Sequence, residues 1–247
     1  MGLTAIRRAG AGPGERTWLA LHGSGRDETD MPPLVEAIDP GAGVVALRGP
    51  VAWEGGYAFF RRHPDRRIDA ADLAARATVL GAAIAAEGLA GPSAQGQSAQ
   101  GQSAQGPSAQ GPSAVGPSAV GLIGFSNGAT MAAALMLRGL VAPQVAILFR
   151  PMLAGDARPD PAPDPAPDPT PAPAPAPLAV DALVLDAAFD ARRAPGDAVA
   201  VSAALRSAGA IVCHRTGRCG HGPAPEELAF AARWLRERDG RVAGDGA

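Results

Sequence analysis

Short apolar runs alternate along this chain with segments whose apolar residues recur every three or four positions. The runs are short and lack polar alternation, which is typical of strands that a sheet buries on both faces. They predict strands at residues 17–21, 44–47, 122–125, 145–149, 182–185 and 211–214. A further run at 3–8 is expected to pair with 17–21 as an edge hairpin across residues 10–14.

Helices are expected between these strands. In residues 69–87, four apolar side chains follow one another at spacings of four, three and four, so they share one helix face. Further helices are expected from 127 to about 140, from 197 to 208, and from Pro225 onward. The alternation of strands and helices predicts one α/β domain over 1–247, with a mostly parallel sheet covered by helices on both faces.

Two segments differ sharply in composition from the rest of the chain. Residues 91–120 are six copies of a Gly-x-Ser-Ala-x pentad, and residues 156–177 alternate proline with alanine and aspartate. A period of five fits no solenoid unit, and small polar side chains bury too little surface to offset the entropy of ordering. We therefore expect 91–119 and 156–177 to be insertions in surface loops, the second stiff and polyproline-like, and neither a domain boundary.

Charge and cysteine content exclude several classes of protein. The 22 basic residues, all arginine, face 24 acidic ones, and a net charge of −2 argues against a nucleic-acid partner. The arginine pairs, such as Arg192 and Arg193, are scattered and are interpreted mostly as solvated surface. Neither a secretory signal nor a membrane span is visible, so a cytoplasmic location is expected. The two cysteines, Cys213 and Cys219, match neither a disulfide framework nor a zinc spacing.

The strongest chemical motif is Gly-Phe-Ser-Asn-Gly at 124–128, which lies between an expected strand and an expected helix. A serine hydroxyl is a weak nucleophile until it stands exposed beside a base. A strand-to-helix turn presents it in that way, and the flanking glycines allow the backbone to crowd together. The motif predicts Ser126 as a nucleophile, with a helix N-cap serine as the alternative.

A second glycine-rich loop, Leu-His-Gly-Ser-Gly at 21–25, directly follows an expected strand. Acyl transfer develops negative charge on the substrate's carbonyl oxygen, and backbone N–H groups are suited to stabilise it. We expect this oxyanion hole to consist of the Ser24 and Asn127 amides, whereas an ordinary glycine turn is the alternative. His22 is expected to pack under the loop in a structural role.

The candidate base is His221, which stands between two glycines after the last strand and before the last helix. Glycine neighbours let a histidine occupy the tip of a loop, where it can reach a nucleophile. The other histidines are less well placed: His63 lies among arginines, and His214 lies within a strand pattern. An exposed loop histidine without a role is the alternative interpretation.

A serine nucleophile and its histidine base usually need a third residue, a carboxylate that orients the histidine. This acid should end a strand between Ser126 and His221. Asp190 and Asp186 both follow the run at 182–185. Asp190 leaves more room for its loop to reach the histidine and is preferred, with Asp186 as the alternative.

Together these residues resemble the small phospholipase/carboxylesterase branch of the α/β-hydrolases, and in particular the hydroquinone-linked bacterial carboxylesterases. The matching stretches are Leu-His-Gly-Ser-Gly-Arg-Asp-Glu at 21–28, Gly-Gly-Tyr-Ala-Phe-Phe-Arg-Arg at 55–62, Gly-Phe-Ser-Asn-Gly-Ala at 124–129, Arg-Pro-Met-Leu at 150–153, Gly-His-Gly at 220–222, Pro-Glu-Glu at 225–227 and Trp-Leu at 234–235. They cover nearly the whole chain outside the two low-complexity segments.

The resemblance implies a serine hydrolase that cleaves small carboxylic esters through an acyl-enzyme intermediate, with no metal and no organic cofactor. It implies a catalytic triad of Ser126, Asp190 and His221. It further implies that Tyr57, Phe59 and Phe60 line the substrate pocket, with ordinary core packing as the alternative.

Three other hypotheses remain open at this point. An acyl-protein thioesterase or a dienelactone-type hydrolase would use a similar fold, but the latter more often has a cysteine nucleophile, and neither cysteine lies in the motif. A non-catalytic binding protein could retain the fold. Residues 156–177 could also dock onto a partner domain, although Ala-Pro repeats lack side chains for recognition. The expected partner is a small-molecule ester, with neither nucleic acid nor membrane.

Overall fold

The computed structural model describes residues 3–12, 15–63, 65, 67–91, 120–154 and 177–244. Its strands are β1 (Ala5–Arg8), β2 (Thr17–Leu21), β3 (Gly43–Leu47), β4 (Val51–Trp53), β5 (Gly56–Ala58), β6 (Val120–Phe125), β7 (Val145–Phe149), β8 (Asp181–Ala187) and β9 (Ile211–Gly217). Seven of them form one sheet in the order β1-β3-β2-β6-β7-β8-β9, parallel except between β1 and β3. Apart from their end residues 91 and 177, the two predicted loop insertions lie outside the described residues.

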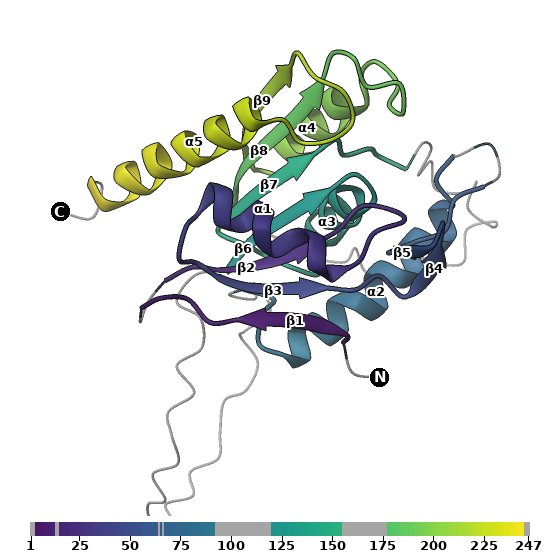
Figure 1. Cartoon of the computed structure of the whole chain (residues 1–247), viewed down its shortest axis with the longest axis horizontal. Helices are drawn as coiled ribbons and strands as arrows, with labels where there is room; N and C mark the ends of the chain where they lie inside the picture. Colours follow the sequence, from purple (N-terminus) through teal and green to yellow (C-terminus); the bar gives the residue numbers. More distant parts are fainter. Residues whose placement is uncertain are drawn as a thin grey trace, which may run out of the picture.

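Helices cover both faces of this sheet (Figure 1). The helices are α1 (Met31–Ile38), preceded by a short 3₁₀ turn η1 (Glu28–Asp30), α2 (Ala70–Ala86), α3 (Asn127–Leu137), α4 (Asp197–Ser207) and α5 (Pro225–Gly244). One apolar core joins α2, α3 and α4 to the sheet, and a second joins α1 and α5 to the opposite face. This arrangement confirms the predicted α/β class with a mostly parallel, two-faced sheet.

The predicted pairing of the first two strands is wrong. β1 runs antiparallel to β3, with Ala5 opposite Leu47, and β2 lies between β3 and β6 as a parallel strand. The reason is burial: Trp18 and Leu19 of β2 are completely inaccessible, so β2 needs neighbours on both sides. β1 ends in two exposed residues, Arg7 and Arg8, as is usual for an edge strand.

Two features of the fold have weak sequence signals. β4 and β5 form a separate hairpin, whose turn places both Glu54 and Gly55 at positive φ, 47° and 81°. Such a turn matches the twist of a two-stranded hairpin. The other feature is α1, a helix of eight residues with prolines in its first turn.

Helix α3 ends at Leu137 rather than near residue 140, and Gly139 follows at a φ of 66°.

Parallel strands direct their carboxyl ends to the same edge of a sheet, where α/β proteins place their sites. The loops that follow β2, β6, β8 and β9 all leave this edge, although they are far apart in sequence. Figure 1 shows these loops on the same side of the molecule. In the part of the chain that the structure describes, none of the helices is long and apolar enough to cross a membrane.

Candidate active site

Ser126 occupies a strained turn between β6 and α3. Its φ of 53° and ψ of −107° are rare for a residue with a side chain, and such a conformation costs roughly 1–3 kcal/mol. The flanking glycines explain how the turn fits. A Cβ at Gly128 would lie 2.2 Å from the Leu21 carbonyl oxygen, and one at Gly124 would lie 2.6 Å from Ala129 Cα. The close approach of α3 to the end of β2 therefore requires glycine at 128, and its close approach to β6 requires glycine at 124.

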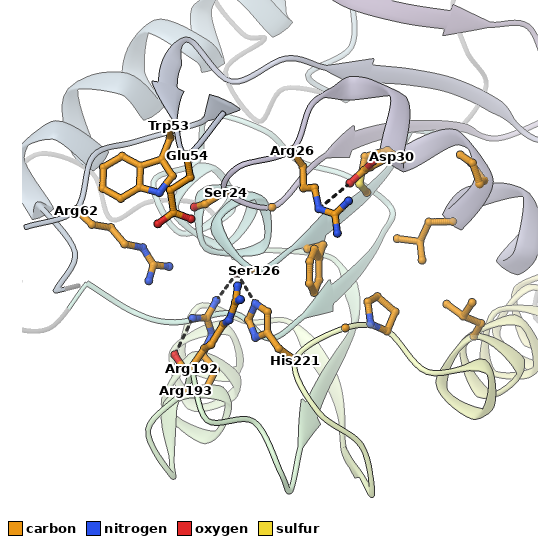
Figure 2. A pocket seen from close by; sticks show the side chains of 18 residues that line it. Ser24, Arg26, Asp30, Trp53, Glu54, Arg62, Ser126, Arg192, Arg193 and His221 are labelled. Carbon is orange, nitrogen blue, oxygen red and sulfur yellow. Dashed lines mark hydrogen bonds and ion pairs between the residues drawn. The ribbon is translucent and has the colours of Figure 1, made fainter. Parts of the chain in front are cut away.

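The three residues of the predicted triad meet at this turn. The Ser126 Oγ lies 3.0 Å from His221 Nε2, and His221 Nδ1 lies 2.7 Å from Asp190 Oδ2. Figure 2 shows the serine and the histidine side by side. With a neutral imidazole, Nδ1–H donates to the carboxylate and Nε2 accepts from the hydroxyl. Asp186 lies within β8 instead, and its Oδ1 accepts from the Ala187 amide at 2.8 Å.

Backbone hydrogen bonds explain why Asp190, four residues beyond Asp186, reaches the histidine. After β8, the Ala188 amide donates to the Gly217 carbonyl at 2.9 Å, and the Phe189 amide donates to the Cys219 carbonyl at 3.0 Å. These bonds tie the acid loop to the chain that leads from β9 to His221. The Asp190 Oδ1 also accepts from the Arg192 amide at 2.8 Å, which orients the carboxylate.

The electrostatics favour an ionised acid and a neutral base. Burial raises the pKa of Asp190, but hydrogen bonds from His221 and the Arg192 amide outweigh it, so the pKa lies below its ordinary value. Burial lowers the pKa of His221. The hydrogen bond to Asp190 opposes this shift, and the positive charge of Arg193 adds to it. His221 is therefore neutral, and able to accept a proton, over a wider pH range than an ordinary histidine.

A buried ion pair holds the loop that carries His221. The Arg150 guanidinium is completely buried and binds Glu227 at 2.8 and 2.6 Å through two nitrogens. The same guanidinium donates to the carbonyls of Gly220 at 3.2 Å and Gly222 at 3.3 Å, the two residues that flank His221. Glu227 also accepts from the Ala224 amide at 3.0 Å, at the start of α5. In the sequence, Arg150 is marked only by the family resemblance, and Glu227 by that resemblance and by its acidic charge at the start of a helix.

The loop that follows β2 packs against the serine turn. A Cβ at Gly23 would lie 2.8 Å from the Phe125 ring, and Ser24 lines the same cavity as Ser126. Asn127 is the first residue of α3, so its amide belongs to a helical turn that has no acceptors of its own. Both residues predicted for the oxyanion hole thus belong to the two segments that border the serine.

His22 lies under this loop, in the place that the sequence analysis expected. Its ring is completely buried, with Nδ1 2.7 Å from the Gly23 carbonyl and Nε2 2.9 Å from the Gly49 amide. Because the Gly23 carbonyl can only accept, Nδ1 must donate to it. Because the Gly49 amide donates, Nε2 must accept, so the ring is neutral with its proton on Nδ1. Burial accordingly lowers the pKa of His22. This ring connects the loop after β2 to the loop after β3 and does not reach the serine's hydrogen-bonded chain.

Arg193 is a site residue that the sequence interpretation missed. Its Nη2 donates to the Ser126 Oγ at 2.8 Å, and its Nε donates to the Arg150 carbonyl at 2.8 Å. The interpretation of this arginine as solvated surface is therefore wrong, because its side chain is partly buried against the serine, whereas Arg192 beside it is exposed. The available signal was its position three residues after Asp190, in the loop that also has to reach His221.

A cavity of about 640 Å³ opens at Ser126, within the range of small-molecule sites, roughly 300–1,000 Å³. Residues from six different parts of the chain line it, including Ser24, Arg26, Asp30, Met31, Leu34, Trp53, Glu54, Arg62, Phe125, Ser126, Arg192, Arg193, His221 and Leu228. Among the described residues, no group of three or more histidine, cysteine or acidic side chains is arranged to hold a metal ion.

The predicted pocket aromatics do not line this cavity. Phe59 and Phe60 are completely inaccessible and belong to the core beneath α2 and α3. Their backbone is held by Asn127, whose Oδ1 accepts from the Phe59 amide at 2.7 Å. Tyr57 lies in a separate depression on the β4–β5 hairpin, with its ring under the Arg48 guanidinium. Packing in the core therefore keeps Phe59 and Phe60 away from the cavity, whereas Trp53 and Phe125 line it.

The sheet order and the strand-turn-helix arrangement around Ser126 define the α/β-hydrolase fold. Among solved structures, the chain is similar to a carboxylesterase from Bacillus cereus, with 24% identity and a TM-score of 0.71 over 95% of this chain and 94% of that one. It is also similar to a carboxylesterase from Mesorhizobium loti, with 27% identity and a TM-score of 0.63 over 91% and 90%.

A third similar structure is acyl-protein thioesterase 2 from Zea mays, with 19% identity and a TM-score of 0.61 over 96% of this chain and 99% of that one. No protein-family model matches the chain, and no curated protein matches it significantly. The similar structures confirm the predicted fold and the resemblance to carboxylesterases of the phospholipase/carboxylesterase type.

Proposed function

We propose that the protein is a serine hydrolase that cleaves small carboxylic esters through an acyl-enzyme intermediate. The observation that carries the proposal is the continuous chain of contacts from Ser126 Oγ through His221 to Asp190, which begins at a cavity large enough for a small ester. The similarity to two carboxylesterases supports this substrate class. The proposed partner is a small-molecule ester, and a cytoplasmic location stays a prediction from the sequence.

In the first half of the reaction, His221 Nε2 takes the hydroxyl proton while Ser126 Oγ attacks the ester carbonyl carbon. Negative charge moves onto the carbonyl oxygen, where the Ser24 and Asn127 amides donate hydrogen bonds. Asp190 accepts from Nδ1–H and stabilises the imidazolium. The tetrahedral intermediate then expels the alcohol, which receives the proton from His221 and leaves an acyl group on the serine.

In the second half, water takes the place of the alcohol. His221 removes a proton from the water, the resulting hydroxide attacks the acyl carbon, and the proton returns to Ser126 as the carboxylic acid departs. Neither half of the reaction transfers electrons to or from an external group. Water and the residues of the site are therefore sufficient to return Ser126 and His221 to their starting states. An acyl-protein thioesterase would use the same residues on a thioester, and the similarity to the Zea mays thioesterase makes this the second candidate.

The proposal is tested by hydrolysis of a p-nitrophenyl ester series and by labelling with a fluorophosphonate probe. Because Ser126 Oγ forms the covalent bond, Ser126→Ala should lower kcat/KM by roughly 10³-fold or more and abolish labelling. Circular dichroism should show an unchanged fold. A Ser126→Ala protein with wild-type turnover, or a wild-type protein that neither turns over nor labels, would overturn the proposal.

The acid is tested with a matched pair of variants. Asp190→Asn removes the charge that orients and stabilises His221, so kcat should fall by roughly 10⁴-fold. Asp186→Asn makes the same chemical change on the preceding strand, where the carboxylate accepts from the Ala187 amide, and should leave kcat near the wild-type value. A large loss in Asp186→Asn with retained activity in Asp190→Asn would reverse the assignment.

A further inference from the structure

The wall of the cavity beside Ser126 carries an excess of positive charge. Of the described residues that line it, the arginines are Arg26, Arg62, Arg192 and Arg193, and the carboxylates are Asp30 and Glu54. Arg26 forms an exposed ion pair with Asp30 at 3.5 Å, on the far side of the opening. Figure 2 shows Arg192 and Arg193 beside Ser126 and His221, and Arg62 farther along the same wall, next to the Glu54 carboxylate. A cavity with this distribution of charge attracts anions.

Arg193 makes its contacts with uncharged acceptors. Besides the Ser126 hydroxyl and the Arg150 carbonyl, its Nη1 donates to the Arg192 carbonyl at 3.2 Å. Burial, followed by repulsion from Arg62, lowers the pKa of Arg193 to about 10, although Asp190 and Asp197 act in the opposite direction. Both observations describe a cation that has lost water and that an incoming anion would stabilise.

The contact with the serine also affects the nucleophile. Ser126 Oγ lies 3.0 Å from His221 Nε2 and accepts a hydrogen bond from Arg193 at 2.8 Å. A guanidinium that occupies a lone pair of the attacking oxygen makes that oxygen less nucleophilic. A carboxylate is a stronger acceptor for a guanidinium than a neutral hydroxyl is, because both partners are then charged. An anionic group bound to Arg193 would therefore compete for the guanidinium and release the serine oxygen.

We propose that Arg193 and Arg62 form a carboxylate-binding subsite, and that the preferred substrates are esters that carry a carboxylate a few bonds from the scissile carbonyl. This inference rests on the proposed ester hydrolysis. Arg193 already touches the attacking oxygen, so a carboxylate bound to it lies close to the reacting carbon. Such a carboxylate can belong to the acid half of the ester, as in a short dicarboxylic hemiester, or to its alcohol half.

Two pairs of esters test the inference, and each pair differs only by a carboxylate in place of an isopropyl group. Monomethyl succinate and methyl 4-methylpentanoate place the change in the acid half. O-acetylglycolate and isobutyl acetate place it in the alcohol half. In the wild-type protein, we expect the carboxylate member of one pair to have the higher kcat/KM, by roughly 10- to 100-fold, which is the worth of a charge-assisted hydrogen bond. The pair that shows the preference identifies the half that carries the carboxylate.

Arg193→Ala should abolish this preference, and Arg62→Ala should weaken it. The matched control is Arg233→Ala, which removes an exposed arginine of α5 that pairs with Glu237 at 3.7 Å, outside the cavity. This control should keep the wild-type ratio. Equal hydrolysis of both members in each pair, or an unchanged ratio in Arg193→Ala, would overturn the subsite while leaving ester hydrolysis intact.

A binding measurement separates the subsite from catalysis. In Ser126→Ala, monomethyl succinate cannot be cleaved and can be titrated by calorimetry. We expect Arg193→Ala, added to this background, to weaken its binding by roughly 10- to 100-fold, with no change for methyl 4-methylpentanoate. Arg193-dependent binding without turnover in the wild-type protein would support the subsite and overturn the proposed function. Binding that does not depend on Arg193 would overturn the subsite.

Discussion

Ser126 lies between a base and a cation, and the two act on it in opposite ways. In the proposed reaction, His221 withdraws the hydroxyl proton, whereas Arg193 donates a hydrogen bond to the same oxygen. The positive charges of Arg193 and Arg192 also oppose Asp190 by disfavouring the imidazolium. Without a bound anion, the lowered pKa keeps the His221 ring neutral, and the Ser126 oxygen keeps its hydrogen bond from Arg193. Both restraints would ease together if an anion neutralised the guanidinium.

The pH dependence of catalysis should report this balance. His221 acts as a base only when neutral, so kcat/KM for p-nitrophenyl acetate should fall as the pH drops through the pKa of His221. Because burial and Arg193 lower that pKa, the midpoint should lie below the ordinary value of 6.5. In Arg193→Ala, a positive charge is removed and the ring is better hydrated, so the midpoint should move to higher pH.

The groups that face the His221 ring are Asp190, Arg193 and Arg192, together with the Phe125 ring at a centroid distance of 5.2 Å. A pH profile of kcat/KM in wild type and Arg193→Ala, with Arg233→Ala as the charge-matched control, checks the direction. A downward or absent movement in Arg193→Ala would show that Arg193 does not act on the base.

At the scale of elements, the loop that carries His221 depends on two elements that contain none of Ser126, Asp190 and His221. Arg150 follows β7 with a φ of 56°, and Glu227 lies in the first turn of α5. Their buried ion pair joins these elements, and the guanidinium then reaches the backbone on both sides of His221. A buried pair of this kind contributes little net stability relative to apolar residues, but breaking it leaves one charge buried without its partner.

Glu227→Gln should therefore lower the free energy of unfolding by about 3–5 kcal/mol, measured by urea denaturation. The matched control is Glu226→Gln, which changes the neighbouring residue of the same helical turn. Glu226 is exposed, so the free energy of unfolding should change by less than about 0.5 kcal/mol. Similar stabilities for the two variants would contradict the structural role assigned to the pair.

At the scale of the whole molecule, hydrogen bonds hold the described residues on both sides of the pentad repeat. On one side, the Ala142 amide donates to the Ala90 carbonyl at 2.8 Å. On the other, Val120 begins β6 and pairs with Thr17 of β2 in the centre of the sheet. The register of the nucleophile strand therefore depends on its neighbours in the sheet and on the buried side chains that it carries.

Deleting residues 97–111, which removes three pentads, should leave kcat/KM and the melting temperature close to wild type. The entropy of closing a loop changes only slowly with its length, by roughly 0.6 kcal/mol for each doubling. Thermal denaturation and hydrolysis of p-nitrophenyl acetate check this expectation. A strong loss of either would mean that the repeat has a specific role in folding or in the site.

Much of the fold follows from local sequence patterns. The buried strands produce continuous apolar runs, and α2 produces a regular spacing of Leu73, Ala77, Leu80 and Ile84, because each element must bury its own face. The pairing of β1 was not predictable in this way. Whether it joins β2 or β3 depends on which strand lacks a neighbour, and that is known only when the whole sheet is assembled.

The residues of the candidate site also differ in whether local sequence or distant contacts identify them. Ser126 carries a local signal, since its strained turn requires glycines at 124 and 128. His221 was recognised by its glycine neighbours and its place after the last strand, although a Cβ at Gly220 or Gly222 would meet no close contact. Asp190 and Asp186 have no such local difference, and the hydrogen bonds between the acid loop and the end of β9 decide between them. For Arg193, the sequence offers only its position three residues after Asp190, because its partner, the serine, is remote in sequence.

By itself, the sequence determined the class of the fold, the turn that carries Ser126 and the loop that carries His221, because these depend on neighbouring residues. Only the tertiary structure decided which strand occupies the edge, which aspartate meets the base, which aromatics line the cavity, and that an arginine caps the serine. Each of these depends on contacts between segments that are distant along the chain. Such contacts are set by how the whole sheet and its loops pack, and not by any local pattern.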